Sequence, residues 1–435
     1  MAIPRALRNN EKMLTNGRRF LLPIVLSAAM CFAQSAPDGP SCDNVNNTSA
    51  SSHFRGSRQN AAPGNVSKLP IRSLLYRGSQ TKIYTRYMPW FGDDRHRDVG
   101  YRSDDERQVS RQVTDMISRG IQGAIVDWYG PNSEVHNQST LLLMKESEAQ
   151  NFEFAISEDA GSLRECEKGR CDVTEKLISD LNYAAEHFLS SPNYVRFDGR
   201  PALFFFGVEK FPIDWRRVRH SIQGNPLIFF RNSGTFANPD ADGAFAWIAP
   251  ETANSGDPMG MEYLKRFYTK GQGSNKIAMG SAYKGFNDAD ASWGKGRVIE
   301  QQCGKTWLAT FAEAGRYYSS GHQLPALIIP TWNDYEEGTE IETGIDNCMQ
   351  VQATVADEKL SWTISGEEET IDHYSVLVQN GSGWRDAGDV PRREHSIALS
   401  RLGLTAPSGA LCVEAVGRAS MLNHSSGAVQ YGQGK

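Results

Sequence analysis

The chain has 435 residues, of which 39% are hydrophobic, so it is long enough to bury the core of one large domain and a smaller one. Its 46 basic and 51 acidic residues give a formal net charge of −5. Because basic residues are not in excess, the composition argues against nucleic acid as a partner.

The first 35 residues have the pattern of an export signal. Arg18 and Arg19 precede an apolar run that extends from residue 20 to residue 33, and small residues follow it. The run is too short to span a bilayer, and an apolar helix that belongs to the fold is the alternative. We therefore expect residues 1–35 to be a signal peptide, and the mature protein to be secreted or periplasmic without attachment to a membrane.

Residues 36–67 are rich in Ser, Asn, Gly and Pro. They carry too few apolar side chains to offset the entropy of ordering them, so we expect a disordered linker. Six of the seven cysteines follow the leader, and an even number in an exported chain permits disulfides. Cys166 and Cys171 are spaced to close a short loop. A metal site is the alternative for this pair, but no cluster of Cys or His accompanies it.

Beyond the linker, short β-rich apolar runs alternate with amphipathic helical patterns. Eight such runs begin at Lys82, Gly123, Phe152, Arg200, Pro226, Gly243, Lys276 and Ala326. Strands that alternate with helices in this way predict an α/β fold, a parallel (β/α)8 TIM barrel, which we place at residues 68–347. A doubly wound open sheet is the rival, because the connection between the fifth and sixth runs is short and no clear helix follows the eighth.

Polar, aromatic and acidic side chains gather at the C-terminal ends of these runs. In a barrel these ends meet on one face, where active sites are built, and this favours the barrel over the open sheet. The residues concerned are Trp90, Asp127, Trp128, Tyr129, Glu158, Asp159, Arg231, Asn232, Trp247, Tyr283 and the stretch 332–337.

After Cys348 the pattern changes to alternating strands without helices. Trp362 lies early in this region, Tyr374 in its middle, and a strand "LCVEAV" near its end. Residues 348–432 therefore predict a small all-β sandwich, which resembles a fibronectin type III module. A β extension packed on the barrel is the alternative, and we expect no chemistry from this region.

The eighth run leads into the acidic stretch "WNDYEEGTEIE". Asp334 and Glu337 are three residues apart, a spacing that can place both carboxylates on one side of the backbone. Glycoside hydrolysis needs such a pair: one protonated carboxyl serves the leaving oxygen, and one ionised carboxylate activates a nucleophile or stabilises the oxocarbenium-like charge. Repulsion between the two raises the proton affinity of one and so supplies an acid. We expect the other glutamates, Glu336, Glu340 and Glu342, to form a solvated loop face.

Flat aromatic rings cover the C–H faces of pyranose sugars, and polar side chains bind their hydroxyls. Core packing is the alternative for each aromatic residue taken alone, and Asp127 is either a catalytic carboxylate or a ligand for substrate hydroxyls. Calcium is an alternative for the acidic stretch, although its spacing matches no EF-hand loop. The substrate-binding candidates are Trp332, Trp128, Tyr129, Trp90, Tyr87, Tyr283, Asn333, Asp127 and Glu158.

Other catalytic motifs are missing from the sequence. It contains no G-x-S-x-G elbow, no P-loop and no H-E-x-x-H motif. Several histidines are scattered along the chain, and we interpret each as a surface or core residue; they are His96, His136, His187, His220 and His322. We expect that no metal and no cofactor is required.

Five segments, in the order "YMPWFG", "GIQGAIVDWYG", "NYVRFDGRPALFFF", "YKGFNDADASWG" and "IPTWNDYEEGTEIE", resemble glycoside hydrolases of family 99 and the related family 71. The resemblance covers about residues 80 to 345. It implies a (β/α) barrel enzyme that cleaves α-linked glycans, internally on α-mannosides for family 99 and on α-1,3-glucan for family 71. On matching positions, it implies that Glu337 is the general acid and later the base, Asp334 its partner carboxylate, and Asn333 a substrate contact.

The chain departs from family 99 at one of these positions. In the family 99 scheme the partner carboxylate assists the sugar 2-hydroxyl as an internal nucleophile, through an anhydro sugar, with retention. That family typically has Glu where this chain has Asp334, and "WNDY" is closer to family 71, for which inversion is expected. One methylene less moves the carboxylate by about 1 Å. The stereochemical outcome and the sugar therefore stay open.

The residues predict an exported, monomeric glycoside hydrolase, and the resemblance implies that it acts internally on an α-linked polysaccharide of the α-1,3-glucan or α-mannan type. The alternative is a non-catalytic glycan-binding barrel protein of the cell envelope. Such a protein would keep the aromatic residues but would not need both Asp334 and Glu337. A purely structural cell-surface protein would need neither.

Overall fold

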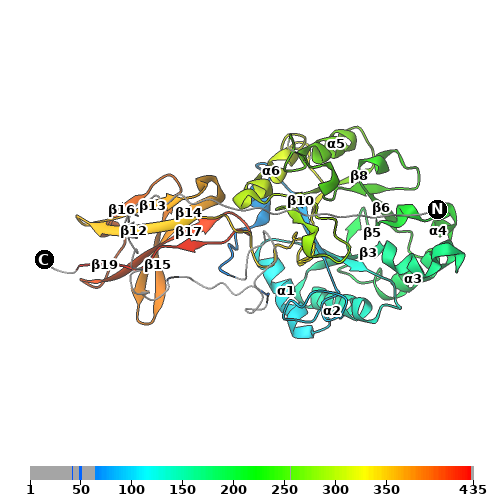
Figure 1. Ribbon diagram of the computed structural model, residues 1–435, viewed down its shortest axis with the longest axis horizontal. Helices are drawn as coiled ribbons and strands as arrows, with labels where there is room; N and C mark the ends of the chain where they lie inside the picture. The colour runs from blue at the N-terminus through cyan, green and yellow to red at the C-terminus, as the bar shows by residue number, and fades with distance from the viewer. Residues whose placement is uncertain (1–41, 43–48, 51–63, 255, 433–435) are drawn as a thin grey trace, which may run out of the picture. The chain divides into compact units, whose positions relative to one another are not determined.

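The structure is a computed structural model that describes residues 42, 49–50, 64–254 and 256–432 (Figure 1). The predicted signal peptide at residues 1–35 and most of the predicted linker at residues 36–67 lie outside the described residues. Within the described part, no helix combines the length and the apolar character needed to cross a membrane.

Eight parallel strands close into a barrel. They follow one another in the order β1-β2-β3-β5-β6-β7-β8-β11, and the pairings of β3 with β5 and of β11 with β1 complete the ring. Every run predicted from the sequence forms one of these strands, and the closure excludes the open doubly wound sheet. The strands are Lys82–Tyr87 (β1), Gly123–Trp128 (β2), Glu153–Asp159 (β3), Arg200–Phe206 (β5), Leu227–Arg231 (β6), Gly243–Phe245 (β7), Ile277–Ser281 (β8) and Ala326–Ile329 (β11).

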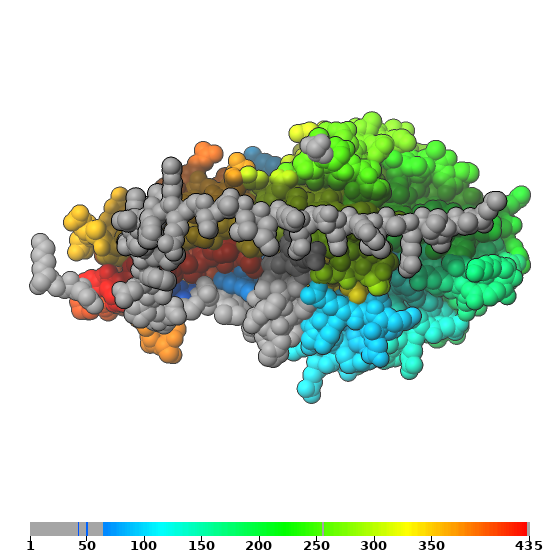
Figure 2. Space-filling view, in the orientation of Figure 1, coloured from blue at the N-terminus to red at the C-terminus, as the bar shows by residue number. Residues whose placement is uncertain are grey.

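Helices cover the outside of the barrel, so that β2 and β11 are buried along their whole length. In α1, Val109, Val113 and Met116 are fully buried, as the helical spacing predicts, and the Asp105 side chain caps its first turn. Helices α1 and α2 lie side by side, in cyan in Figures 1 and 2. The α-helices of the described part are Glu106–Ser118 (α1), Glu134–Gln150 (α2), Val173–His187 (α3), Trp215–Ser221 (α4), Met261–Gln272 (α5) and Lys305–Ala314 (α6).

Short elements complete the barrel region. Strand β4 (Arg196–Phe197) pairs antiparallel with β5, and β9 (Phe286–Asn287) pairs with β10 (Val298–Ile299) in a separate two-stranded ladder. The 3-10 turns of this region are Ile71–Leu74 (η1), Ala160–Gly169 (η2), Val208–Lys210 (η3), Ser233–Ala237 (η4), Pro250–Thr252 (η5), Asp288–Asp290 (η6) and Gln302–Gly304 (η7). Two further 3-10 turns, Glu368–Thr370 (η8) and Leu399–Arg401 (η9), lie in the C-terminal region.

The C-terminal region is a β-sandwich of a three-stranded and a five-stranded antiparallel sheet, as the sequence predicts. Its own hydrophobic core contains Trp362 and Tyr374, whose rings meet edge to face at 5.2 Å. The likeness to a fibronectin type III module stays a prediction. The strands are Gln350–Ala356 (β12), Lys359–Ser365 (β13), Ile371–Asn380 (β14), Gly383–Pro391 (β15), Ser396–Ala398 (β16), Gly409–Gly417 (β17), His424–Ser425 (β18) and Val429–Tyr431 (β19).

Three disulfides join the six cysteines that follow the predicted leader. The pairing of Cys166 with Cys171 confirms the loop closure expected from the sequence. The other pairs are Cys303–Cys348 and Cys42–Cys412. Some described residues of the 36–67 segment make specific contacts, since Cys42 forms a disulfide and Val66, which is fully buried, forms a β-bridge with Leu422.

Candidate active site

A cavity of about 760 Å³ opens at the C-terminal ends of the barrel strands. This is the face on which the sequence predicts the site, and the volume lies in the range of small-molecule binding pockets. Polar and aromatic side chains line it together. Those that bear on function are Arg86, Trp90, His96, Asp127, Tyr129, His136, Asp159, Phe206, Trp247, Trp293, Asp334 and Glu337.

The loop after β11 brings Asp334 and Glu337 to the cavity. Asp334 Oδ1 accepts the backbone N–H groups of Glu336 at 3.0 Å and Glu337 at 2.9 Å, while the Asp334 N–H donates to Thr331 Oγ1 at 2.8 Å. This side-chain turn holds the two carboxyl groups on one side of the backbone. No hydrogen bond from the described residues reaches Asp334 Oδ2, so that oxygen is available to a ligand.

The pKa values of both carboxyl groups of this pair are raised. Burial raises the pKa of Asp334 well above its usual value, and the charge of Glu337 raises that pKa further. Burial also raises the pKa of Glu337, against the effect of the Trp293 indole, whose Nε1 donates to Glu337 Oε1 at 3.2 Å. Two neighbouring groups with such shifts resist double ionisation, so the pair retains a proton more readily than an ordinary carboxyl does.

A second pair of acidic side chains lies at the ends of β2 and β3. Asp127 forms an ion pair with Arg86, whose guanidinium lies 4.9 Å from the ring centre of Phe206. Burial raises the pKa of Asp127, although Arg86 opposes this effect. Asp159 accepts the Gly161 N–H at 2.6 Å, and burial, followed by the charge of Asp127, raises its pKa to about 7.

Two aromatic pairs form walls of the cavity. The rings of Trp90 and His96 are stacked at 4.6 Å with an interplanar angle of 5°, and Nδ1 of His96 lies 2.9 Å from Glu336 Oε2. The rings of Tyr129 and His136 lie 4.4 Å apart. Flat rings of this kind can face the C–H surfaces of a sugar.

His136 is a neutral side chain at the cavity. Burial lowers the pKa of His136 to about 4, and its Nδ1 lies 2.7 Å from Ser133 Oγ. Its Nε2 is buried without a hydrogen-bond partner among the described residues. A buried polar atom without a partner is costly, and a ligand hydroxyl would satisfy it.

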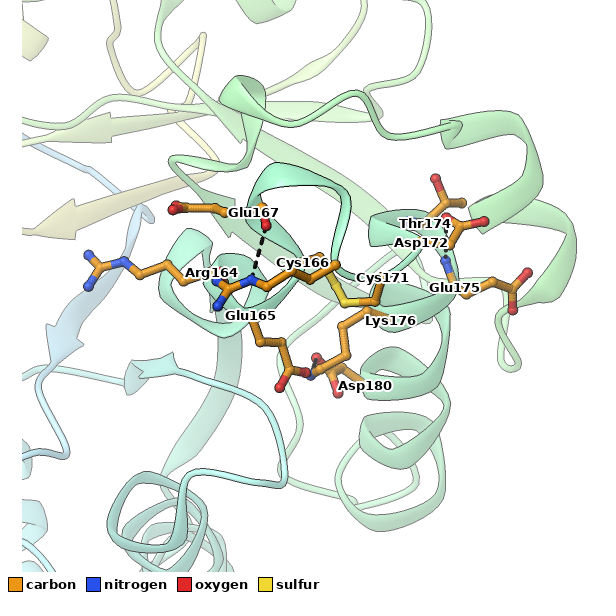
Figure 3. Close-up of a disulfide and its surroundings, with 11 residues drawn as sticks. Arg164, Glu165, Cys166, Glu167, Cys171, Asp172, Thr174, Glu175, Lys176 and Asp180 are labelled. Atoms are coloured by element: carbon orange, nitrogen blue, oxygen red, sulfur yellow. Dashed lines mark hydrogen bonds and ion pairs between the residues drawn. A yellow bond between two sulfur atoms is a disulfide. The ribbon is translucent and has the colours of Figure 1, made fainter.

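The loop after β3 supplies a further part of the cavity lining. Turn η2 is closed by the Cys166–Cys171 disulfide, and its residues Arg164 and Glu165 reach the cavity, as does Lys176 from α3. Figure 3 shows Glu165, Lys176 and Asp180 converging beside the disulfide, where Lys176 forms ion pairs with both acids, whereas the Arg164 side chain extends away from them. The disulfide therefore restrains a polar segment of the cavity rim.

Three predicted site residues at strand ends do not line the cavity, because side chains alternate along a strand and their neighbours face inward instead. The Tyr87 hydroxyl donates to Gln112 on α1 at 2.8 Å. The Trp128 indole donates to Asn137 on α2 at 3.2 Å. Glu158 accepts a hydrogen bond from the Ser162 hydroxyl and is fully buried.

Three other predicted residues act within the protein. Trp332 is fully buried, with the guanidinium of Arg119 lying 4.8 Å from its ring centre. Asn333 accepts the Met88 N–H at 2.8 Å and donates to the Met88 carbonyl at 3.0 Å, so it ties the acidic loop to the end of β1. The Tyr283 hydroxyl donates to a backbone carbonyl near the start of α5 at 3.0 Å. These contacts leave Asp127, Tyr129, Trp90, Asp334 and Glu337 as the predicted site residues that line the cavity.

The expectation that Glu336, Glu340 and Glu342 form a solvated face is wrong. Their exposed fractions are 4%, 0% and 0%. Glu340 lies 3.1 Å from the ammonium group of Lys284, which is equally buried, and Glu342 accepts the Tyr335 hydroxyl at 2.6 Å. Within the described residues, no three Cys, His, Asp or Glu side chains are grouped so that they could hold a metal ion.

Some cavity residues were not predicted from the sequence. Arg86 had a signal, since a charged residue interrupts the apolar run of β1. His96 and His136 had none. His136 is buried, as a core histidine is, but both side chains also line the cavity, a place that the sequence did not indicate. Trp293 lies in the segment "NDADASWG", whose local pattern assigns it no role.

Comparison with known proteins gives remote likenesses. Neither a family model nor a curated protein matches the sequence. Among solved structures, a family 99 endo-α-mannosidase from Bacteroides thetaiotaomicron is 17% identical, with 61% of this chain and 87% of that chain covered and a TM-score of 0.48. A glycoside hydrolase-like protein is 13% identical, with the same coverage and a TM-score of 0.47. An endo-β-1,4-mannanase from Thermotoga petrophila is 9% identical over 83% of this chain and 99% of that chain, with a TM-score of 0.38.

Structural neighbours of the chain thus include glycoside hydrolases, among them members of the family whose segments the sequence resembles. Their identities and TM-scores are low. What the cavity can do therefore has to be derived from its own side chains.

Proposed function

We propose that the protein is an exported glycoside hydrolase that cleaves an α-linked polysaccharide of the α-1,3-glucan or α-mannan type. One observation carries the proposal: Asp334 and Glu337 both line an aromatic-walled cavity and both have raised pKa values. The three disulfides support export, because such bonds persist in oxidising compartments. Internal attack on the polysaccharide follows from the resemblance to family 99.

In this proposal Glu337 is the general acid. It donates its proton to the glycosidic oxygen while the bond to the anomeric carbon breaks, and the carboxylate that results accepts the Trp293 N–H. The charge of Arg297 also favours that ionised form. In a two-step retaining route Glu337 then acts as the base that activates water, whereas a one-step inverting route gives it no second role.

Asp334 is the partner carboxylate. Its Oδ1 is held by two backbone N–H groups, which favour the ionised form, and Oδ2 is the oxygen left for the reaction. While Glu337 is protonated, its charge no longer opposes ionisation of Asp334. On an α-mannoside, whose 2-hydroxyl is trans to the leaving oxygen, retention follows if Oδ2 takes the 2-hydroxyl proton while O2 displaces the leaving oxygen from C1. Inversion follows if Oδ2 activates a water molecule, which is open to an α-glucan as well.

The remaining cavity residues would bind the sugar. Trp90 and Tyr129 offer aromatic rings, while Asp127 and Asp159 offer carboxyl oxygens. The unsatisfied Nε2 of neutral His136 suits a substrate hydroxyl. We further propose that residues 1–35 are a signal peptide, that residues 36–67 are a linker, and that residues 348–432 form a separate fibronectin type III-like module on a monomeric enzyme.

The test replaces Glu337 by Gln, which keeps the shape of the side chain but cannot supply a proton. We expect Glu337→Gln to lower kcat on α-1,3-glucan or α-mannan oligosaccharides by at least about 100-fold, with the dissociation constant changed less than about 3-fold. Glu186→Gln, the same substitution on the exposed face of α3, is the control and should keep full activity. Full turnover by Glu337→Gln would refute the proposal. Binding without turnover by the wild type would favour a non-catalytic glycan-binding protein.

A further inference from the structure

Trp293 is exposed to an extent unusual for its residue type. The chain has nine tryptophans, all within the described residues, and Trp293 is the only one in the exposed class, with 43% of its surface accessible. The other two tryptophans of the cavity wall, Trp90 and Trp247, are 4% and 5% exposed. An indole kept in water forgoes its burial free energy, so an exposed indole on a cavity wall points to a ligand.

The loop between β9 and β10 is built to hold this ring in place. The fully buried carboxylate of Asp288 accepts the backbone N–H groups of Lys295 at 3.1 Å and Arg297 at 2.7 Å, and also accepts Arg297 Nε at 2.8 Å. A Cβ at Gly294 would lie 1.8 Å from the Asp288 carbonyl oxygen, so only glycine fits directly after Trp293. The tryptophan is therefore preorganised on a closed loop.

The same loop is joined to Glu337 at two points. The Asn287 N–H donates to the Glu337 carbonyl oxygen at 2.8 Å, and the Trp293 indole N–H donates to Glu337 Oε1 at 3.2 Å. The Trp293 ring also lies edge-on to Trp90 and to His96, at 6.3 Å and 6.0 Å between ring centres. Trp293 thus combines a largely accessible ring with an indole N–H that donates to the candidate acid.

We propose that Trp293 is a positioning and specificity-determining residue on the leaving-group side of the cavity. Its ring covers the sugar that departs, and its N–H orients the Glu337 carboxyl. The inference rests on the proposed function. A general acid must lie within hydrogen-bond distance of the leaving oxygen, so a side chain bonded to that acid stands next to the leaving sugar. The substrates favoured are therefore glycans with a pyranose on both sides of the scissile bond.

Two variants separate the ring from its N–H group. Trp293→Ala removes both, and we expect KM for an α-linked oligosaccharide to rise about 10-fold, with no such rise for the matching α-glycosyl fluoride, whose leaving group is not a sugar. Trp293→Phe keeps a ring, so KM should be largely restored. Because the N–H favours ionised Glu337, both variants should move the alkaline limb of kcat/KM to higher pH. Trp215→Phe, a matched change outside the cavity, should alter neither property.

The experiment measures KM and the pH profile for these variants, and oligosaccharide binding by calorimetry with Trp293→Ala in the Glu337→Gln background. If Trp293→Ala changes KM by the same factor for both substrates and does not move the alkaline limb, the inference is overturned, although the proposed hydrolase activity still stands. If Trp293→Ala weakens glycan binding but the wild type never cleaves glycan, the result would support Trp293 as a sugar-binding residue and contradict the proposed hydrolase. A wild type that neither binds nor cleaves would overturn both. If Trp293→Ala does not fold, the pH limb of Trp293→Phe decides.

Discussion

Lys284→Met should destabilise the protein by about 3 to 5 kcal/mol, because it leaves the buried carboxyl of Glu340 without its partner. Both side chains are 0% exposed, and Lys284 Nζ lies 3.1 Å from Glu340 Oε1. At that distance, and with an effective dielectric constant of about 20, two unit charges attract by about 5 kcal/mol. Burial raises the pKa of Glu340 to about 7 against the opposing effect of Lys284, so the carboxyl in Lys284→Met takes up a proton more readily and the loss falls toward the lower value.

The assay is urea unfolding followed by tryptophan fluorescence, for the wild type, Lys284→Met and Lys284→Met/Glu340→Leu. The double variant should recover most of the loss, because it removes both charges from the core. The deficit of Lys284→Met should also shrink from pH 7 to pH 5. Without Lys284, which opposes the shift, the pKa of folded Glu340 rises further, so the variant gains more stability than the wild type as the pH falls. A loss below about 1 kcal/mol, or a double variant as unstable as the single one, would refute this account of the pair.

Three further predictions follow from the surroundings of the cavity. Asp159, with a pKa of about 7, binds a proton in the folded state between about pH 4 and 7, so its contribution to stability is lost as the pH rises through this range. Asp159→Asn should therefore make the unfolding free energy depend less on pH between about pH 4 and 7, and an unchanged dependence on pH would contradict this. Replacing Cys166 and Cys171 by Ser opens a loop of sequence separation 5 and should cost about 2 kcal/mol in thermal unfolding while raising KM; unchanged KM would show that the disulfide does not hold the cavity rim. Gly294→Ala forces the loop backbone to shift, so kcat/KM on oligosaccharides should fall as in Trp293→Ala; full activity would mean that the loop geometry does not matter.

The barrel could be predicted because its signals are local. Each buried strand appears as a short apolar run, and eight runs that mostly alternate with helical patterns leave few topologies open. The β-sandwich and the Cys166–Cys171 disulfide are likewise visible in alternation and spacing. The cavity edge followed from the barrel, since parallel strands end on one face.

Which side chain at a strand end faces the cavity could not be predicted as easily. Asp127 and Trp128 are adjacent in β2. Because side chains alternate between the two faces of a strand, an error of one residue in that alternation exchanges the inward and outward side chains. Asp127 faces the cavity, whereas Trp128 packs against Tyr183 with ring centres 6.1 Å apart. The sequence around β2 contains no signal that sets this phase.

The acidic stretch illustrates a second limit. Glu340 and Glu342 resemble a solvated charge run because their partners are distant in sequence: Lys284 for Glu340, and Ser49 and Gln112 for Glu342. Only the folded chain brings these donors together. These contacts stabilise the loop that carries Asp334 and Glu337. Glu340 and Glu342 therefore have a structural role rather than a place on a solvated surface.

The most direct test of the central claim is a digest of α-1,3-glucan and α-mannan oligosaccharides, followed in time by NMR of the product anomers. We predict that the wild type releases oligosaccharides whose first-formed reducing ends have a single anomeric configuration, and that Glu337→Gln releases none. For an α-mannan, that configuration also decides whether Asp334 acts on the 2-hydroxyl or on water. Equal release by the wild type and Glu337→Gln, or no release from either glycan by the wild type, would contradict the claim that this cavity hydrolyses α-glycans with Glu337 as its acid.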